Sequence, residues 1–145
     1  MKIVDSILSH KMAAEHLKKL HIEVKSVEQN VENLSGGQAQ AVAIARATAF
    51  NSRVVVMDEP TAALAIKEVG KVLDLIKNLK QQGVSVILIS HRLDDVFYVC
   101  DRVMSLFHGK NFEEAPLAKT NRNEVIGWLM GTKGHTKSLA HDRID

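Results

Sequence analysis

Two polar clusters that follow apolar runs carry the residues best suited to chemistry. Asp58-Glu59 comes directly after the run Val54-Val55-Val56-Met57 and directly before Pro60. An acidic pair at the end of a buried strand can hold a hydrated Mg²⁺ and orient an attacking water. The alternative is a polar strand end with a helix-capping acid, because acidic residues before a proline are common in turns. The pair alone leaves both interpretations open.

The second cluster is Ser90-His91, which ends the run that begins at Val84. A single histidine after a strand is usually structural. An imidazole can, however, donate a hydrogen bond to a phosphate oxygen in either charge state. The interpretation of His91 therefore depends on whether it lies beside Asp58-Glu59.

A third string could bind a phosphate through the backbone. In Leu34-Ser35-Gly36-Gly37-Gln38, the spacing of Ser35 and Gln38 fits a capping box, which predicts the start of a helix. Gly36 and Gly37 would leave the first N–H groups uncovered, and a bare helix N-terminus is partly positive and rich in donors. The alternative is an ordinary N-cap with glycines for close packing. The whole string would arise by chance in about one window in a million.

The apolar pattern predicts the elements that position these clusters. Strands are expected at 54–57 and 84–90, with a hairpin from 102 onward around His108-Gly109-Lys110. Helices are expected at residues 6–20, 40–50, 66–81, 92–100 and 123–130. In the helix 66–81 the apolar stripe is Ile66, Val69, Leu73, Ile76 and Leu79, and Gly83 ends it.

Strand, helix and strand between residues 54 and 90 make a βαβ unit. This predicts an α/β fold with a parallel sheet. The ligand crevice of such sheets lies at the carboxyl ends of the strands. Asp58-Glu59 and Ser90-His91 both fall there, so we expect the two clusters to be neighbours.

Composition limits the function classes. The 145 residues suffice for one domain, and 19 basic against 17 acidic residues leave a net charge of +2, too small to indicate nucleic-acid binding. A membrane-spanning helix needs about 20 apolar residues, and the apolar runs here are far shorter. The first 20 residues lack an apolar signal-peptide stretch. We expect a cytoplasmic chain whose membrane role, if any, comes through a partner.

The three clusters together resemble the motifs of ATP-binding-cassette (ABC) ATPases. The string at 34–38, continued by Ala41-Val42-Ala43-Ile44-Ala45-Arg46-Ala47, is similar to the signature sequence of that family. Residues 54–59 resemble its acidic motif, and Ile89-Ser90-His91-Arg92-Leu93 resembles its switch-histidine segment. The resemblance covers about residues 5–131. It implies part of a P-loop-NTPase-like α/β domain, a parallel sheet flanked by helices, with a piece of the helical subdomain at the N-terminus.

The resemblance also implies site roles, with ATP and Mg²⁺ as cofactors. The signature loop, residues 34–38, would contact the γ-phosphate of ATP held by the opposite protomer of a head-to-tail dimer. Asp58 would hold Mg²⁺ through water, and Glu59 would polarise the attacking water. His91 would contact the γ-phosphate and Glu59.

Domain limits and partners follow from the same resemblance. We expect the helical subdomain at about 1–50, the rest of the catalytic core at about 51–131, and a flexible tail at 132–145. The partners would be another ABC ATPase subunit, in a homo- or heterodimer, and transmembrane permease subunits. Within the family, residues 58–64 with Lys67-Glu68-Val69, and residues 90–97, resemble the carbohydrate-importer branch.

The chain departs from the family pattern in two places. A P-loop needs Gly-x-x-x-x-Gly-Lys-Ser/Thr, and the Gly-Lys pair Gly109-Lys110 is followed by Asn111 and has Met104 in place of the first glycine. Asp58, Glu59 and His91 would therefore lack a phosphate in their own subunit. The loop 62–65, where the family often has an aspartate, reads Ala-Ala-Leu-Ala.

Three hypotheses remain. The first is a portion of the ATPase subunit of a sugar importer, which we do not expect to hydrolyse ATP alone. The second is a catalytically incompetent module that dimerises with a complete ATPase and regulates it. The third is a non-transport ABC ATPase, against which the near-neutral charge speaks. Because strands normally buried on both faces would be exposed, we also expect marginal stability or aggregation.

Overall fold

The computed structural model describes residues 6–50 and 52–132. The chain divides into two compact units, Met1–Val99 and Cys100–Asp145, which are described separately. The expected tail at 132–145 lies outside the described residues except for Thr132. The expected subdomain boundary near residue 50 stays a prediction.

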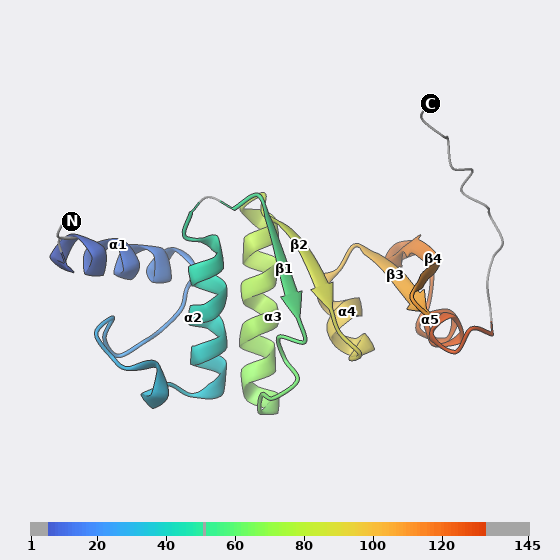
Figure 1. Cartoon of the computed structure of the whole chain (residues 1–145), viewed down its shortest axis with the longest axis horizontal. Coiled ribbons are helices and arrows are strands. Elements are labelled where there is room, and N and C mark those ends of the chain that lie inside the picture. Colours follow the sequence, from blue (N-terminus) through green and yellow to red (C-terminus); the bar gives the residue numbers. More distant parts are fainter. Residues whose placement is uncertain (1–5, 51, 133–145) are drawn as a thin grey trace. The chain divides into compact units, whose positions relative to one another are not determined.

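The first unit contains the predicted helices and strands in the predicted order (Figure 1). The elements are α1 (Ser6–Lys19), the 3₁₀ turn η1 (Val31–Asn33), α2 (Gly36–Thr48), β1 (Val54–Asp58), α3 (Ile66–Gln81), β2 (Ser85–Ile89) and α4 (Leu93–Val99). Helix α2 begins four residues before the predicted residue 40, because the Ser35–Gln38 capping box closes there. Helix α3 has the predicted bounds, and Gly83 follows it with a left-handed φ of 83°.

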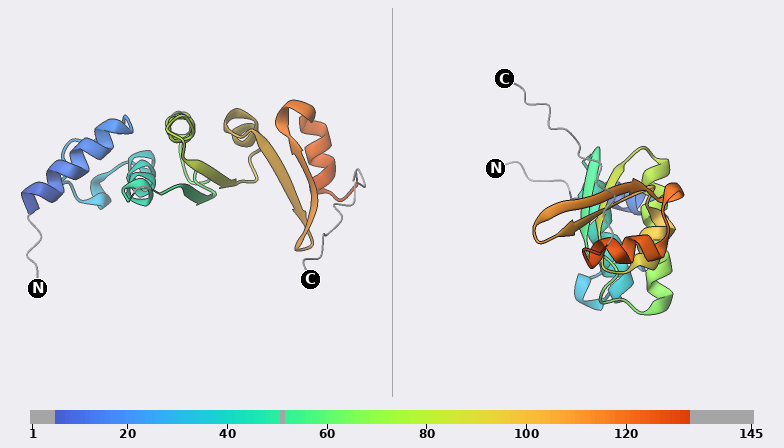
Figure 2. Two further views of the ribbon diagram at one scale, coloured as in Figure 1. Left: turned by 90° about the horizontal axis from the view of Figure 1, so that it is seen from above. Right: turned by 90° about the vertical axis from the view of Figure 1, so that its right-hand side faces the viewer.

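Strands β1 and β2 pair in parallel, from Val54 opposite Ser85 to Asp58 opposite Ile89. Helix α3 connects them and packs against the sheet (Figure 2). The predicted βαβ unit is confirmed. Because the strands pair to their last residues, the loops that follow them leave the sheet at the same edge.

The core of this unit lies between α3 and one face of the sheet. The sheet contributes the buried Val55 and Met57. The buried side chains of α3 are Val69, Val72, Leu73, Leu75, Ile76 and Leu79. The predicted stripe was wrong at Ile66, which is 90% exposed. The predicted stripe omitted Val72 and Leu75, which are buried. With these two residues included, the centre of the buried face lies farther around the helix from Ile66.

The other face of the sheet is apolar and exposed. Val54, Val56, Ile87 and Ile89 alternate with the inward-facing residues, and each is about half exposed or more. Parallel sheets are normally covered on both faces. The expected exposure of apolar strand residues is confirmed for this sheet.

Helices α2 and α3 lie side by side, and Figure 2 (left) shows both end-on. Close approach at the start of α2 requires glycine: a Cβ on Gly37 would lie 2.8 Å from Cβ of Glu68. On its other side α2 meets α1, where His16 Nε2 lies 3.0 Å from Ala45 O and 3.1 Å from Thr48 Oγ1.

The second unit is the predicted hairpin followed by a helix. Strands β3 (Arg102–Phe107) and β4 (Lys110–Pro116) are antiparallel, and α5 (Arg122–Leu129) follows the 3₁₀ turn η2 (Leu117–Lys119). His108 and Gly109 both have positive φ, as a two-residue hairpin turn requires. Helix α5 packs on β3 and buries Val125 and Trp128. Among all described helices, none has the length and apolarity needed to cross a membrane.

The α2–α3 contact predicts opposite effects of two glycine-to-alanine substitutions. Gly37→Ala forces the backbone of α2 away from Glu68, so we expect it to lower the free energy of unfolding by about 1–3 kcal/mol. Gly70→Ala is the matched control: it lies within α3 with nothing within 4 Å of the added Cβ, and we expect a gain of about 0.5–1 kcal/mol. Urea unfolding of dilute protein, followed by circular dichroism, measures both. Equal effects of the two variants would contradict the close contact.

Candidate functional site

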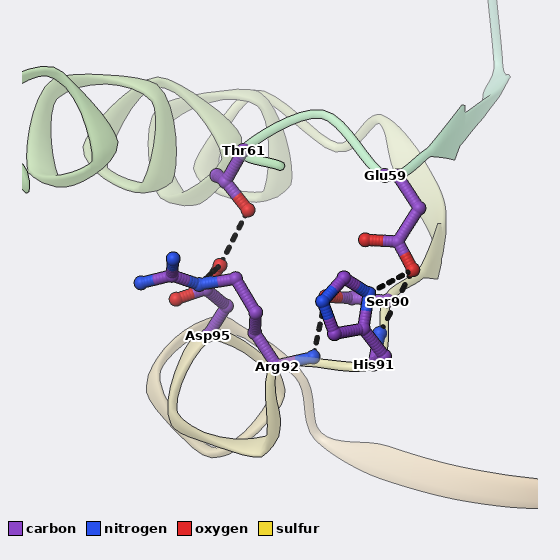
Figure 3. A network of polar contacts seen from close by, with 6 residues as sticks. All are labelled: Glu59, Thr61, Ser90, His91, Arg92 and Asp95. Atoms are coloured by element: carbon purple, nitrogen blue, oxygen red, sulfur yellow. Dashed lines mark hydrogen bonds and ion pairs between the residues drawn. The ribbon is translucent and has the colours of Figure 1, made fainter. Parts of the chain in front are cut away.

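The loops after β1 and β2 bring Glu59 and His91 into direct contact (Figure 3). The His91 backbone N–H donates to Glu59 Oε1 at 2.9 Å, and His91 Nδ1 lies 2.7 Å from the same oxygen. The two residues are 32 positions apart in the sequence. The structure thus brings together the two clusters that the sequence predicted to be neighbours.

The backbone at Glu59 is turned sharply to present the carboxylate. Its φ is +46°, in the left-handed region that costs a non-glycine residue about 1–2 kcal/mol. The Glu59 N–H donates to Ile89 O at 2.9 Å, which extends the β1–β2 pairing by one residue into the loop. Strained residues of this kind persist where surrounding contacts hold them, and they cluster at functional sites.

The environment keeps Glu59 ionised. The hydrogen bond from the His91 side chain lowers the pKa of the Glu59 carboxyl, and its partial burial opposes this only in part. The His91 backbone N–H and the nearby charges of His91 and Arg92 lower the pKa further. An ionised carboxylate only accepts hydrogen bonds, so the proton in this contact sits on Nδ1 of His91.

This proton position restricts what His91 can do with its other nitrogen. With Nδ1 donating to Glu59, Nε2 carries a proton only when the ring is charged. Donation from Nε2 to a phosphate oxygen therefore requires the imidazolium form. The sequence had led us to expect donation in either charge state of the ring. The His91 side chain is largely exposed, so Nε2 is accessible to a ligand.

Glu59 and Asp58 leave acceptor oxygens near the strand ends. Glu59 Oε2 is buried and has no hydrogen-bond partner among the described residues. Asp58 is exposed at the last position of β1. Within the described part of the chain, no group of three acidic, histidine or cysteine side chains makes a metal cage. A hydrated Mg²⁺ bound by one carboxylate plus substrate phosphates fits this arrangement, because Mg²⁺ usually keeps several waters.

The signature loop starts α2 through a complete capping box. Ser35 Oγ accepts from the Gln38 N–H at 3.2 Å, and Gln38 Oε1 accepts from the Ser35 N–H at 3.1 Å. Gln38 Nε2 also donates to Glu23 O at 3.0 Å. Both the oxygen and the nitrogen of the Gln38 side-chain amide thus form hydrogen bonds within the chain. Its expected contact with a partner's ATP stays a prediction, one that would require these bonds to rearrange.

Gly36 and Gly37 differ in their surroundings. Gly36 is exposed, whereas Gly37 is half-buried beneath the side chain of Glu68. Hydrogen bonding from the Ser35 side chain, and then from the Gly37 N–H, lowers the pKa of the Glu68 carboxyl. A carboxylate at a helix N-terminus is favourable because that end is partly positive. Glu68 is a candidate site residue that the analysis of motif chemistry missed.

The described residues include no hydrogen bond or ion pair that joins the signature loop to Glu59 or His91. The structure therefore brings Glu59 and His91 together, with Asp58 next to them in the chain, and leaves Ser35, Gly36, Gly37 and Gln38 as a separate cluster. This separation is compatible with the expectation that the signature loop acts on a nucleotide held by another subunit.

A second set of contacts beside Glu59 was not expected from the sequence. Thr61 Oγ1 donates to Asp95 Oδ2 at 2.5 Å, and Arg92 Nε forms an ion pair with the same Asp95 oxygen at 3.2 Å (Figure 3). The Arg92 N–H donates to Ser90 Oγ at 3.0 Å. Thr61 and Asp95 are almost fully buried. Asp95 falls within the predicted helix 92–100, and the sequence assigned it no role because a single acidic residue produces no periodic pattern.

Comparisons with known proteins agree with this geometry. A family profile described as ABC transporter matches residues 8–62. A xylose/arabinose import ATP-binding protein of Sulfolobus acidocaldarius is 44% identical over 109 residues, which cover 75% of this chain and 43% of that protein. A fructose import ATP-binding protein of Rhizobium meliloti is 48% identical, over 69% of this chain and 39% of its own length. A ribose import ATP-binding protein of Bacillus subtilis is 38% identical, over 83% and 24%.

Solved structures give the same result at the level of the fold. A dimeric ATP-binding cassette bound to ADP and phosphate superposes with a TM-score of 0.66 at 32% identity, over 80% of this chain and 50% of that one. A nucleotide-free ATP-binding cassette gives 0.70 at 28% identity, over 83% and 46%. The predicted α/β cassette fold is confirmed. This chain spans less than half the length of the curated relatives named above, and it belongs to the family of ABC transporter ATP-binding proteins.

Proposed function

We propose that this chain is part of the ATP-binding subunit of an ABC importer for sugars. The contact between Glu59 and His91 at the ends of paired parallel strands carries the proposal. Three relatives are named for the import of xylose/arabinose, fructose and ribose. Their identities of 38–48% to this chain support a sugar as the class of transported substrate. We place the assembled subunit on the cytoplasmic face of a membrane, bound to permease subunits.

The site residues divide the work of hydrolysis among them. Glu59 receives the proton of the attacking water on its carboxylate, which already accepts two hydrogen bonds from His91 at Oε1. Its lowered pKa keeps the carboxylate in the accepting form at neutral pH. His91 in its charged form donates Nε2–H to the phosphate undergoing attack. Asp58 would hold Mg²⁺ through its waters, and the ion would supply positive charge that neutralises the phosphate oxygens.

The phosphate cradle must come from outside these 145 residues. No Gly-x-x-x-x-Gly-Lys-Ser/Thr string occurs in the sequence. The exposed apolar face of β1 and β2 also requires a covering segment, because parallel sheets are buried on both sides. We infer that one polypeptide segment supplies both the cradle and the cover.

A regulatory module is the second candidate function. One observation favours it: the signature loop has an intramolecular carboxylate, Glu68, against Gly37. Such a chain would occupy the dimer face of a complete ATPase without turning over ATP itself. ATP hydrolysis by the chain together with its covering segment separates the two functions.

The signature loop is tested by mixing the chain with an intact cassette subunit. We expect the mixture to hydrolyse ATP, and Ser35→Arg to reduce the chain-dependent rate at least tenfold, because the bulky side chain blocks the start of α2. Ser26→Arg is the matched control, since Ser26 is an exposed serine whose Oγ also accepts a backbone N–H, from Glu28 at 3.1 Å. Phosphate release is the measurement. Equal rates for both variants would remove the signature loop from the function.

Glu59 is tested in a different mixture, with a P-loop-bearing cassette segment that lacks residues equivalent to this chain. We expect the reassembled domain to hydrolyse ATP and Glu59→Gln to slow it about 100-fold or more, because the amide keeps the hydrogen bond from His91 but cannot take a proton. Glu28→Gln, at an exposed glutamate in the loop before α2, is the control. A Glu59→Gln enzyme with the wild-type rate would exclude Glu59 as the proton acceptor.

A further inference from the structure

We infer that Thr61 and Asp95 are positioning residues that lock the Glu59 loop to the His91 segment. Their consequence for hydrolysis depends on the proposed function, whereas their effect on Glu59 itself does not. Neither residue belongs to the three family motifs that the sequence analysis singled out, and neither contacts Glu59 or His91 through a described hydrogen bond or ion pair.

The contact between Thr61 and Asp95 is a hydrogen bond that is shielded from water. Thr61 and Asp95 are 1% and 2% exposed, and the hydroxyl–carboxylate distance of 2.5 Å is in the range of short charge-assisted bonds. The bond joins residues 34 positions apart, from the loop after β1 to the first turn of α4. Because no water competes for either partner, this contact fixes the distance between the two segments more firmly than a surface contact would.

Asp95 is also tied to the residue next to His91. Its Oδ2 lies 3.2 Å from Arg92 Nε, so a single carboxylate oxygen meets both Thr61 and Arg92. Arg92 is further held by its N–H, which donates to Ser90 Oγ. The segment 90–92 that carries His91 is therefore held to α4 through Arg92 and closed on itself by the bond to Ser90.

These contacts close a ring around the Glu59–His91 pair (Figure 3). The ring runs from Glu59 along the chain to Thr61, across to Asp95, on to Arg92, and back through His91 to Glu59. The two loops thus contact each other at two places. Two contacts fix their relative orientation, whereas one contact would allow them to rotate. None of the three family motifs predicts the second contact, between Thr61 and Asp95.

The backbone of Glu59 explains why a second point is needed. A φ of +46° is unfavourable for glutamate and is kept only when neighbouring contacts over-determine it. On one side the Glu59 N–H is held by Ile89 O, and on the other Thr61 is held by Asp95. Without the Thr61 contact the loop can relax, and the carboxylate would move away from its two His91 donors.

A purely structural role would be served better by apolar side chains. Burying a carboxylate is unfavourable unless it is paired, and well-packed hydrophobic residues often replace buried ion pairs without loss of stability. At Asp95 the carboxylate instead recruits one partner from each of the two segments. This arrangement provides directionality, which apolar packing does not.

The test is hydrogen exchange of the His91 backbone amide, followed by NMR in the whole 145-residue chain without nucleotide. That N–H donates to Glu59 Oε1 at 2.9 Å, so its protection reports whether the Glu59 loop and the His91 segment keep their orientation. In Thr61→Val and Asp95→Asn we expect the His91 amide to exchange about tenfold faster relative to the core amides of α3, because its acceptor moves away.

Thr61→Ser is the rescue control, because it keeps the hydroxyl and loses only a methyl group. We expect the His91 amide of Thr61→Ser to exchange as in the wild type even if the melting temperature falls. A Thr61→Val chain that melts earlier but keeps the wild-type exchange of the His91 amide relative to α3 would overturn the inference, since the contact would then support only the fold. If Asp95→Asn does not fold, the near-isosteric Thr61→Val chain still decides the question.

The same variants in the reassembled ATPase separate this inference from the proposed function. We expect Thr61→Val to lower kcat at least tenfold with little change in KM, and Thr61→Ser to restore kcat. A wild-type mixture that never hydrolyses ATP, combined with faster exchange of the His91 amide in Thr61→Val, would refute the proposed function and leave the positioning role standing. Hydrolysis unaffected by Thr61→Val would overturn the positioning role in catalysis.

Discussion

The parallel pairing of β1 with β2 is the constraint on which the candidate site depends. The register places Asp58 opposite Ile89, so both strands end at the same level of the sheet. The Glu59 N–H then continues the ladder to Ile89 O, and Glu59 and His91 meet just beyond the two strand ends. A shift of the register by one residue would reverse the faces of every side chain in β2 and separate this pair. The apolar core between the sheet and α3 therefore fixes a polar contact that contributes little to the core itself.

Packing against α3 shapes the candidate binding site at the start of α2. Glycine at position 37 lets α3 approach, and this approach brings the Glu68 carboxylate to the positive end of α2. Hydrogen bonds from the Ser35 side chain and then from the Gly37 N–H lower the pKa of the Glu68 carboxyl at this position. Any phosphate that binds this helix end meets an anion of the same chain already beside Gly37. The exposed Gly36 is therefore the more accessible part of the signature loop.

The sequence predicted the elements well and the pairwise contacts poorly, for a physical reason. Apolar periodicity predicted the bounds of α3 and the βαβ unit, because burial on one face repeats along many residues. The neighbourhood of Glu59 and His91 followed from the rule that parallel strands end together. The Thr61–Asp95 bond and the Glu68–Gly37 contact had no such signal, since each depends on single side chains 31 or 34 positions apart. Ile66 was misplaced because the buried face of α3 includes Val72 and Leu75 and is therefore rotated away from the stripe read from the sequence.

The exposed sheet face and the candidate site at Glu59 and His91 are carried by the same two strands. Val54, Val56, Ile87 and Ile89 face outward on the same two strands whose ends carry Glu59 and His91. A segment packed on that face would bury these side chains and reach the strand ends, where Glu59 Oε2 has no partner among the described residues. Burial of the apolar face and completion of the site would then be one event, because both lie on the same pair of strands. Assembly of the site would accordingly draw its driving force from hydrophobic burial, and the polar contacts at the strand ends would supply its geometry.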